Sequence, residues 1–235
     1  MRIVVSHLTR MNPGYICVAG LDLDSGAHIR PVLNSTRLAT AMLRRCGGIF
    51  DIGSVIDLGT TSYQGRRPET EDHLFSFKQA RHAGMVPAPA FWQLLRQTSQ
   101  ARLTDIFGPD LKRIDHTCAV DPGKGQASLG CLAAERPVLR VDKYNKIRIG
   151  VTTNPALPPL DLPVTDIRLY ETDQRTPRYE VIEDVAARIG EGTSVLLGVG
   201  LTRAYAKLGD QPARHWLQVN NVHLADDPLF TDRER

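Results

Sequence analysis

Residues 15–30, YICVAGLDLDSGAHIR, decide the fold class. The first seven of them are strand-forming, and Asp24-Ser25-Gly26 has the composition of a hairpin turn. Residues 27–30 return as the partner strand, which Pro31 ends because proline cannot donate a hydrogen bond to a neighbouring strand. This stretch predicts an antiparallel hairpin early in the chain.

The remaining sequence continues in the same manner. Further strands are predicted at 3–5, 53–59, 128–134, 138–141, 146–151, 167–170, 195–199 and 216–219. Helices are predicted at 37–45, 89–97 and 177–189, and 103–111 fits either a short helix or a loop. Because strands and helices do not alternate regularly, a doubly wound parallel sheet is disfavoured, and we expect a β-rich α+β fold or small barrels.

The size and composition are those of a folded soluble protein. A chain of 235 residues can form one large domain or two small ones. No apolar run approaches the roughly 20 residues that a membrane-spanning helix needs, so we expect no membrane partner. Residues 1–7 predict a first strand rather than a signal peptide. The four dispersed cysteines are then expected to be reduced, and the protein to be cytoplasmic.

The basic residues are unevenly distributed, although the net charge is only +3. Six of the arginines, Arg30 and Arg37 among them, lie in residues 1–50 against two aspartates. The planar fork of arginine suits phosphate recognition. A GC-rich genome would also explain why there are 23 arginines and only 6 lysines, so the clustering carries more weight than the ratio.

No catalytic or cofactor motif is complete. Gly198-Val199-Gly200 has Arg203 where a dinucleotide-binding loop needs a third small residue, and Gly123-Lys124-Gly125 lacks the Ser or Thr of a phosphate loop. His116, Cys118 and Cys131 would give three zinc ligands, but a structural site needs four. We therefore expect no metal, no cofactor and no assigned catalytic residue, and binding rather than catalysis.

Two clusters combine basic and aromatic residues. One, on the predicted hairpin 138–151, contains Arg140, Lys143, Tyr144, Lys146 and Arg148. The other, near the end of the chain, contains Arg203, Tyr205, Lys207, Arg214, His215 and Trp216. Cationic grooves with aromatic platforms are typical of barrels that bind single strands, so single-stranded DNA or RNA is the favoured partner. The alternative is that the aromatics pack in the core and the charges form a solvated face.

Three stretches resemble the dual-OB domain family. They are residues 18–22 with Ile29-Arg30-Pro31-Val32, residues 51–58, and residues 200–203 with 215–220. The resemblance implies two oligonucleotide/oligosaccharide-binding (OB) barrels in tandem with intervening helices, which we place at 1–115, with a helical insert, and 116–235. It also implies nucleic-acid binding, in a prokaryotic defence or conflict system. By position it points to Arg30, Arg203, Trp216 and Asn220.

Two other functions remain open. Small barrels also serve as protein adaptors, so the chain could dock a partner enzyme within a multi-protein complex. The seven histidines are scattered, and a pair that meets in space could act as acid and base in a metal-free nuclease.

Overall fold

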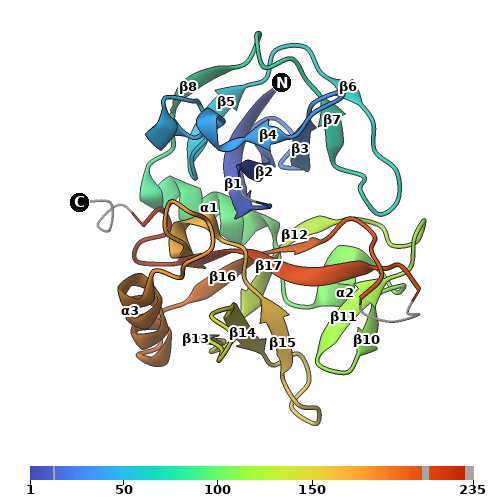
Figure 1. Ribbon diagram of the computed structural model, residues 1–235, viewed down its shortest axis with the longest axis vertical. Helices are drawn as coiled ribbons and strands as arrows, with labels where there is room; N and C mark the ends of the chain where they lie inside the picture. Colours follow the sequence, from blue (N-terminus) through green and yellow to red (C-terminus); the bar gives the residue numbers. More distant parts are fainter. Residues whose placement is uncertain (13, 208–211, 231–235) are drawn as a thin grey trace.

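The chain is mostly β-structure, as the sequence predicts, and its strands form three sheets. The computed structural model describes residues 1–12, 14–207 and 212–230. Figure 1 shows two β-rich halves stacked along the long axis, with helix α1 (Ala88–Thr98) between them. The eight-stranded sheet of the N-terminal half forms the upper part, and the six-stranded and three-stranded sheets form the lower part.

The N-terminal sheet has eight strands in the order β6-β7-β3-β2-β1-β5-β8, with β4 paired to β2. Its strands are β1 (Arg2–Arg10), β2 (Tyr15–Asp22), β3 (His28–Val32), β4 (Leu38–Ala39), β5 (Ser54–Asp57), β6 (Ser62–Tyr63), β7 (Asp72–Leu74) and β8 (Arg81–Met85). The hairpin predicted in residues 15–30 is confirmed, since β2 and β3 pair antiparallel with Gly20 opposite Ile29.

Strand β1 is longer than the sequence predicts, because it is covered on both faces. Every residue from Ile3 to Thr9 is buried, including the polar Ser6 and His7. The side-chain amide of Asn221, in the C-terminal half, forms hydrogen bonds with the backbone of β1. Its Oδ1 accepts the Leu8 N–H at 2.8 Å, and its Nδ2 donates to Leu8 O at 3.3 Å. Thus β1 belongs to the N-terminal sheet and also contacts the C-terminal half.

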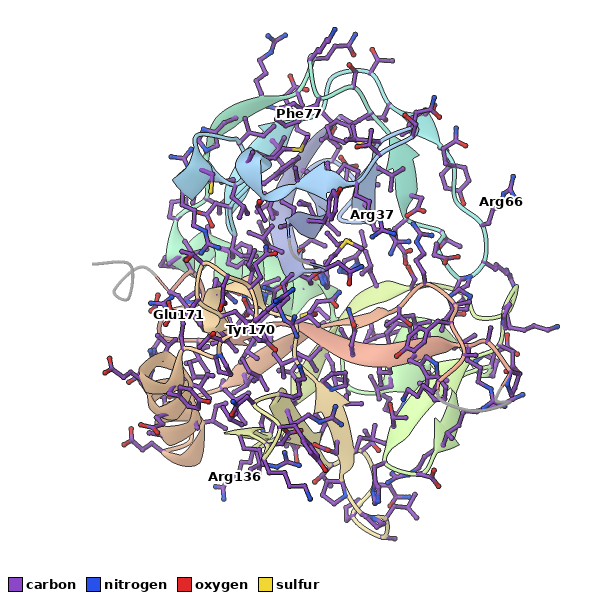
Figure 2. All side chains as sticks on the ribbon, in the orientation of Figure 1. Arg37, Arg66, Phe77, Arg136, Tyr170 and Glu171 are labelled. Atoms are coloured by element: carbon purple, nitrogen blue, oxygen red, sulfur yellow. The ribbon has the colours of Figure 1, made fainter. Side chains whose placement is uncertain are left out.

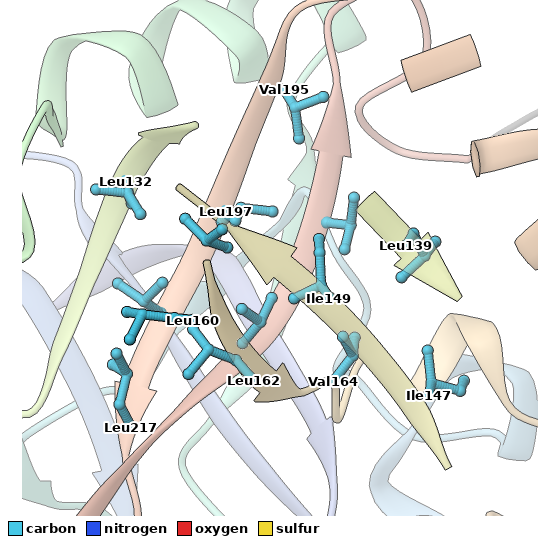
Figure 3. Close-up of a cluster of buried hydrophobic side chains, with 14 of the residues drawn as sticks. Leu132, Leu139, Ile147, Ile149, Leu160, Leu162, Val164, Val195, Leu197 and Leu217 are labelled. Carbon is cyan, nitrogen blue, oxygen red and sulfur yellow. The ribbon is translucent and has the colours of Figure 1, made fainter. Parts of the chain in front are cut away.

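The C-terminal half consists of a six-stranded sheet, β10-β11-β17-β16-β12-β9, and a three-stranded sheet, β13-β14-β15. Their strands are β9 (Ser99–Gln100), β10 (Lys112–Ile114), β11 (Thr117–Val120), β12 (Leu129–Ala134), β13 (Val138–Val141), β14 (Ile147–Val151), β15 (Leu160–Pro163), β16 (Val195–Leu201) and β17 (His215–Leu224). Figure 3 shows the core that joins them, with Ile149 and Leu162 facing Leu132, Leu197 and Leu217.

Two of the predicted helices are confirmed. They are α1, with Pro87 at its N-cap, and α3 (Tyr179–Gly190), while residues 103–111 contain the short α2 (Leu103–Phe107). The helix predicted at 37–45 is wrong: β4 is followed by two 3-10 turns, η1 (Thr40–Met42) and η2 (Arg44–Cys46). Pairing with β2 holds Leu38 and Ala39 extended, and Leu43 between the two turns is extended as well.

The strand predicted at 167–170 is also wrong, because it contains a 3-10 turn, η3 (Ile167–Leu169). Asp166 caps this turn by accepting the Arg168 N–H at 3.1 Å, and a capping carboxylate favours a helical turn over a strand. The division at residue 115 stays a prediction; β9 and β10, which precede it, pair with β12 and β11 of the six-stranded sheet. Within the described residues, no helix has both the length and the apolarity needed to cross a membrane.

Candidate nucleic-acid interface

The β13–β14 hairpin carries two arginines on the outer face of the three-stranded sheet. Arg140 and Arg148 are directly opposite each other and share this face, whereas Ile147 and Ile149 point into the core. Asp161 on β15 accepts from Arg140 Nη2 at 2.9 Å and from Arg148 Nε and Nη2 at 3.1 and 3.0 Å. One carboxylate between two guanidinium groups leaves this face positive.

The connection between β16 and β17 carries the second cluster. Trp216 is only 4% exposed; its indole N–H donates to Tyr205 O at 3.1 Å, and Lys207 Nζ lies 3.6 Å from its ring centroid. Tyr205 is 46% exposed, with its ring centroid 6.4 Å from that of Trp216. Tyr205 is therefore the ring of this pair that is open to solvent, and the buried Trp216 lies beside it.

These two clusters, far apart in the sequence, meet in space. Arg148 lies on β14, which pairs with β15, and Thr165 just beyond β15 donates its N–H to Val219 O on β17 at 2.9 Å. β15 also packs against β17, which places Arg148 and Lys207 on neighbouring elements. Burial lowers the pKa of Lys207, and the charge of Arg148 lowers it further. We call this surface the β14–β17 patch and define it by Arg140, Arg148, Tyr205, Lys207 and Arg214.

The edge of the patch adds a further lysine and a second carboxylate. Asp121 accepts from Lys112 Nζ at 2.9 Å and from Arg214 Nε at 3.1 Å. The hydrogen bonds from Lys112 and then Arg214 lower the pKa of Asp121, which keeps it ionised. Even so, the basic side chains outnumber the acidic ones, because Asp121 and Asp161 each face two cations.

Several of the predicted residues lie outside the patch. Lys143 and Tyr144 are at the tip of the β13–β14 hairpin, where Lys143 Nζ is 5.1 Å from the centroid of the Tyr144 ring and Tyr144 is 70% exposed. Arg37 belongs to the N-terminal half, with its guanidinium 5.7 Å from the Tyr15 ring centroid. Figure 2 shows Arg37 in the upper half, away from the hairpin. Their nucleic-acid roles stay predictions.

Arg30 and Arg203 lie where the two halves meet. Arg30 is buried on β3, and its Nε donates to Asp72 Oδ1 at 2.5 Å. Arg203, from the C-terminal half, donates through Nη2 to Asp72 Oδ2 at 2.7 Å and lies 3.1 Å from Glu69 Oε1. Asp72 therefore bridges arginines of both halves. A guanidinium that is buried and ion-paired, as in Arg30, is poorly placed to contact a phosphate.

Asn220 is likewise buried between the halves. Its Nδ2 lies 3.2 Å from His7 Nδ1 on β1, and its Oδ1 accepts from Gln218 Nε2 at 2.8 Å. The side chain is 4% exposed. This geometry gives Asn220 a role in joining β1 to β17, and its predicted contact with nucleic acid has no support from its exposure.

Four of the seven histidines, His7, His28, His215 and His223, do not form an accessible acid–base pair. His7 and His28 lie with ring centroids 5.4 Å apart, but burial lowers the pKa of both, that of His28 to about 4. His223 is completely buried, and its pKa is lowered to about 4 by burial. His215 instead contacts Thr202 O at 2.9 Å. A buried neutral imidazole cannot reach a nucleic-acid backbone.

Sequence reasoning missed Glu71, which is buried on the N-terminal side of the junction. Its carboxylate accepts from Ser128 N and Oγ, both at 2.7 Å, and from Leu129 N at 3.0 Å. Burial raises the pKa of Glu71, although the Ser128 hydrogen bonds and Arg30 oppose this. No sequence pattern could indicate it, because its partners are distant in the chain.

A groove of about 1430 Å³ in the C-terminal half was missed as well. Its lining includes four arginines, Arg96, Arg102, Arg113 and Arg136, against Glu135. They come from α1, the segments around α2 and β10, and the turn after β12, so only the fold brings them together. Figure 2 shows Arg136 reaching outward at the bottom of the molecule.

The cysteines are not arranged as metal ligands in the part of the chain that the structure describes. No group of three or more His, Cys, Asp or Glu side chains is placed to hold an ion among those residues. Burial raises the pKa of Cys118 to about 11 and that of Cys131 to about 12, so both are thiols at neutral pH.

A protein-family model described as a dual OB-containing domain matches residues 1–222. This confirms the resemblance carried by the three sequence stretches. None of the curated proteins matches the chain.

Proposed function

The chain belongs to the family of dual OB-containing domains, and on that premise we propose that it is a nucleic-acid-binding module whose interface is the β14–β17 patch. We take the eight-stranded sheet as one OB-like unit, and the six- and three-stranded sheets together as the other. The observation that carries the proposal is the meeting of two basic–aromatic clusters on one surface. Each cluster alone is an ordinary set of surface charges.

The chemistry of the patch suits a phosphate backbone. Arg148 and Arg140 present guanidinium N–H groups from a rigid sheet, and Asp161 fixes their orientation. Arginine forks match phosphate oxygens, and neutralising phosphates releases counterions, so binding is expected to weaken as salt rises.

Single strands fit the patch better than duplexes. Tyr205 is half exposed beside Lys207, so a splayed base can stack on its ring while the phosphate contacts the neighbouring cations. Duplex DNA hides its base faces and would use only the charges. A single-stranded partner, DNA or RNA, is therefore the proposed ligand, and no contact among the described residues favours a docked enzyme or histidine catalysis over it.

The test is binding to labelled single-stranded DNA and RNA of about 12 nucleotides, a length within the span of one or two OB folds. We expect Arg148→Glu/Lys207→Glu to lose binding by roughly tenfold or more at low salt, because two attractive charges become repulsive. The matched control is Arg96→Glu/Arg136→Glu, which reverses two charges in the groove of the same half.

Binding lost in the patch variant and retained in the groove variant supports the proposal. The reverse result would move the interface to the groove and show the patch to be wrong. Absence of salt-dependent binding by the unaltered protein, even at low salt, would contradict nucleic-acid binding altogether.

A further inference from the structure

A second cationic site lies between the two halves, on the side where β1 meets η3. It is a cavity of about 490 Å³. One wall comes from residues 43–51 of the N-terminal half, and the other from η3, Arg178 at the start of α3, and Phe230. Small-molecule sites have volumes of roughly 300–1,000 Å³, so the cavity is the size of a single nucleotide rather than a length of strand.

The lining has an excess of positive charge. Arg44, Arg45, Arg168 and Arg178 line the cavity together with a single carboxylate, Asp51. Arg168 is already neutralised by Asp166, with Nη2 to Oδ2 at 2.7 Å. Within the described residues, no carboxylate oxygen lies within 4.0 Å of the guanidinium groups of Arg44 or Arg45. Arg178 Nη1 donates to Arg168 O at 3.1 Å. Arg44 and Arg45 are therefore the two guanidinium groups that we assign to a ligand.

Arg44 is positioned without being neutralised. Its Nη1 donates to His82 Nε2 at 2.7 Å. Burial and the charge of Arg44 lower the pKa of His82, so the acceptor is a neutral imidazole at neutral pH. A neutral acceptor orients the guanidinium while its charge stays available, which differs from Arg140, Arg148 and Arg203 with their carboxylate partners.

The rest of the cavity suits the body of a phosphate ester. Leu43 and Phe50 are buried apolar residues on the same wall as the two arginines. Asp51 Oδ1 accepts the Ile52 N–H at 2.8 Å, and its carboxylate is the acceptor available for a hydroxyl or amino group. Burial raises the pKa of Asp51 despite the nearby arginines, so this carboxylate lies partly out of water beside the exposed Arg44 and Arg45.

We propose that this cavity binds a phosphomonoester, with the phosphate on Arg44 and Arg45 and the remainder against Phe50 and Asp51. The site is separate from the β14–β17 patch and does not depend on it. Two molecules share this chemistry: a free mononucleotide and the phosphorylated 5′ end of a nucleic-acid strand.

The experiment measures binding of AMP and adenosine by calorimetry, and of one oligonucleotide with a 5′-phosphate or a 5′-hydroxyl. The variant is Arg44→Ala/Arg45→Ala, whose two side chains are exposed and tolerate truncation. The matched control is Arg66→Ala/Arg67→Ala, a second adjacent exposed pair, and Figure 2 shows Arg66 on the outer edge of the upper half. Melting temperatures check that both variants fold.

We expect a phosphate-dependent affinity that falls by roughly tenfold or more in Arg44→Ala/Arg45→Ala, because charge-assisted hydrogen bonds to phosphate are lost. The control pair and Arg148→Glu/Lys207→Glu should leave this phosphate dependence unchanged. If AMP shows it, the ligand is a free nucleotide; if only the oligonucleotide does, the ligand is a strand end. Equal binding with and without phosphate, or equal loss in the control pair, would overturn the proposal.

Discussion

Asp161 and Asp166 lie five positions apart, and each holds arginine through both carboxylate oxygens, but one is at the surface and the other is inside. Asp161 is 33% exposed and joins Arg140 to Arg148 in the β14–β17 patch. Asp166 is completely buried, accepts from Arg168 Nε and Nη2 at 3.0 and 2.7 Å, and also accepts the Val222 N–H.

The difference shows that the same pair of residue types serves two purposes. The arginine beside Asp166 also donates to Pro228 O and Val222 O, so the buried pair connects η3 to β17 and the segment that follows. Asp161 and its two arginines form fewer hydrogen bonds to other parts of the chain, and their charged groups stay partly exposed to water. The buried Arg168 therefore holds the fold, whereas Arg140 and Arg148 stay in contact with water and are the arginines that we propose to bind.

Asp166→Ala should have the largest effect on stability. It leaves Arg168 buried without its counterion, and breaking a buried pair in this way costs about 3–5 kcal/mol. The surface counterpart, Asp161→Ala, should change the free energy of unfolding by less than about 1 kcal/mol. Denaturant unfolding of both variants measures the difference.

The same two variants separate stability from binding. Because Asp161→Ala removes a negative charge from the patch, it should also tighten binding to single strands. Equal destabilisation by the two substitutions would contradict the distinction between the buried and the surface pair.

A pH dependence of stability should come from the buried region and not from the patch. Burial lowers the pKa of His223 from 6.5 to about 4, so the unfolded chain takes up a proton at this residue before the folded chain does. The contribution of the neutral His223 to the free energy of unfolding is complete above pH 6.5. It is lost as the pH falls towards 4, a decrease of roughly 3 kcal/mol.

Unfolding free energies measured between pH 7 and pH 4.5 check this expectation. His223→Gln should fall less steeply with decreasing pH than the unaltered protein, whatever its stability at pH 7. His116→Gln, at an exposed position, is the control and should keep the original slope. An identical slope for His223→Gln would show that this residue is not held neutral.

The sequence predicts the local structure where local forces decide it. The hairpin of β2 and β3 follows from strand-forming residues around a Ser-Gly turn, and α1 and α3 follow from helical spacing. Residues 37–45 and 167–170 were predicted wrongly because pairing with β2 and the Asp166 cap determine their conformation. A pattern of helix and strand propensities along the sequence does not contain either influence.

The candidate site was predictable only in part. Both basic–aromatic clusters were found from the sequence, but their meeting at Arg148 and Lys207 depends on how β15 lies against β17. Some of the carboxylate partners are too far away along the chain for a local sequence pattern to indicate them. Asp72, for example, is 131 positions from Arg203. Because of this ion pair, Arg203, which the sequence predicts to bind nucleic acid, instead connects the two halves of the molecule.

The salt dependence of single-strand binding tests the central claim most directly. The logarithm of the association constant falls with the logarithm of salt concentration by about 0.7 for each phosphate neutralised on a single strand. Arg140→Gln/Arg148→Gln should therefore reduce this slope by about 1.4 if each arginine contacts one phosphate. A slope unchanged from that of the unaltered protein would contradict the assignment of the β14–β17 patch as the nucleic-acid interface.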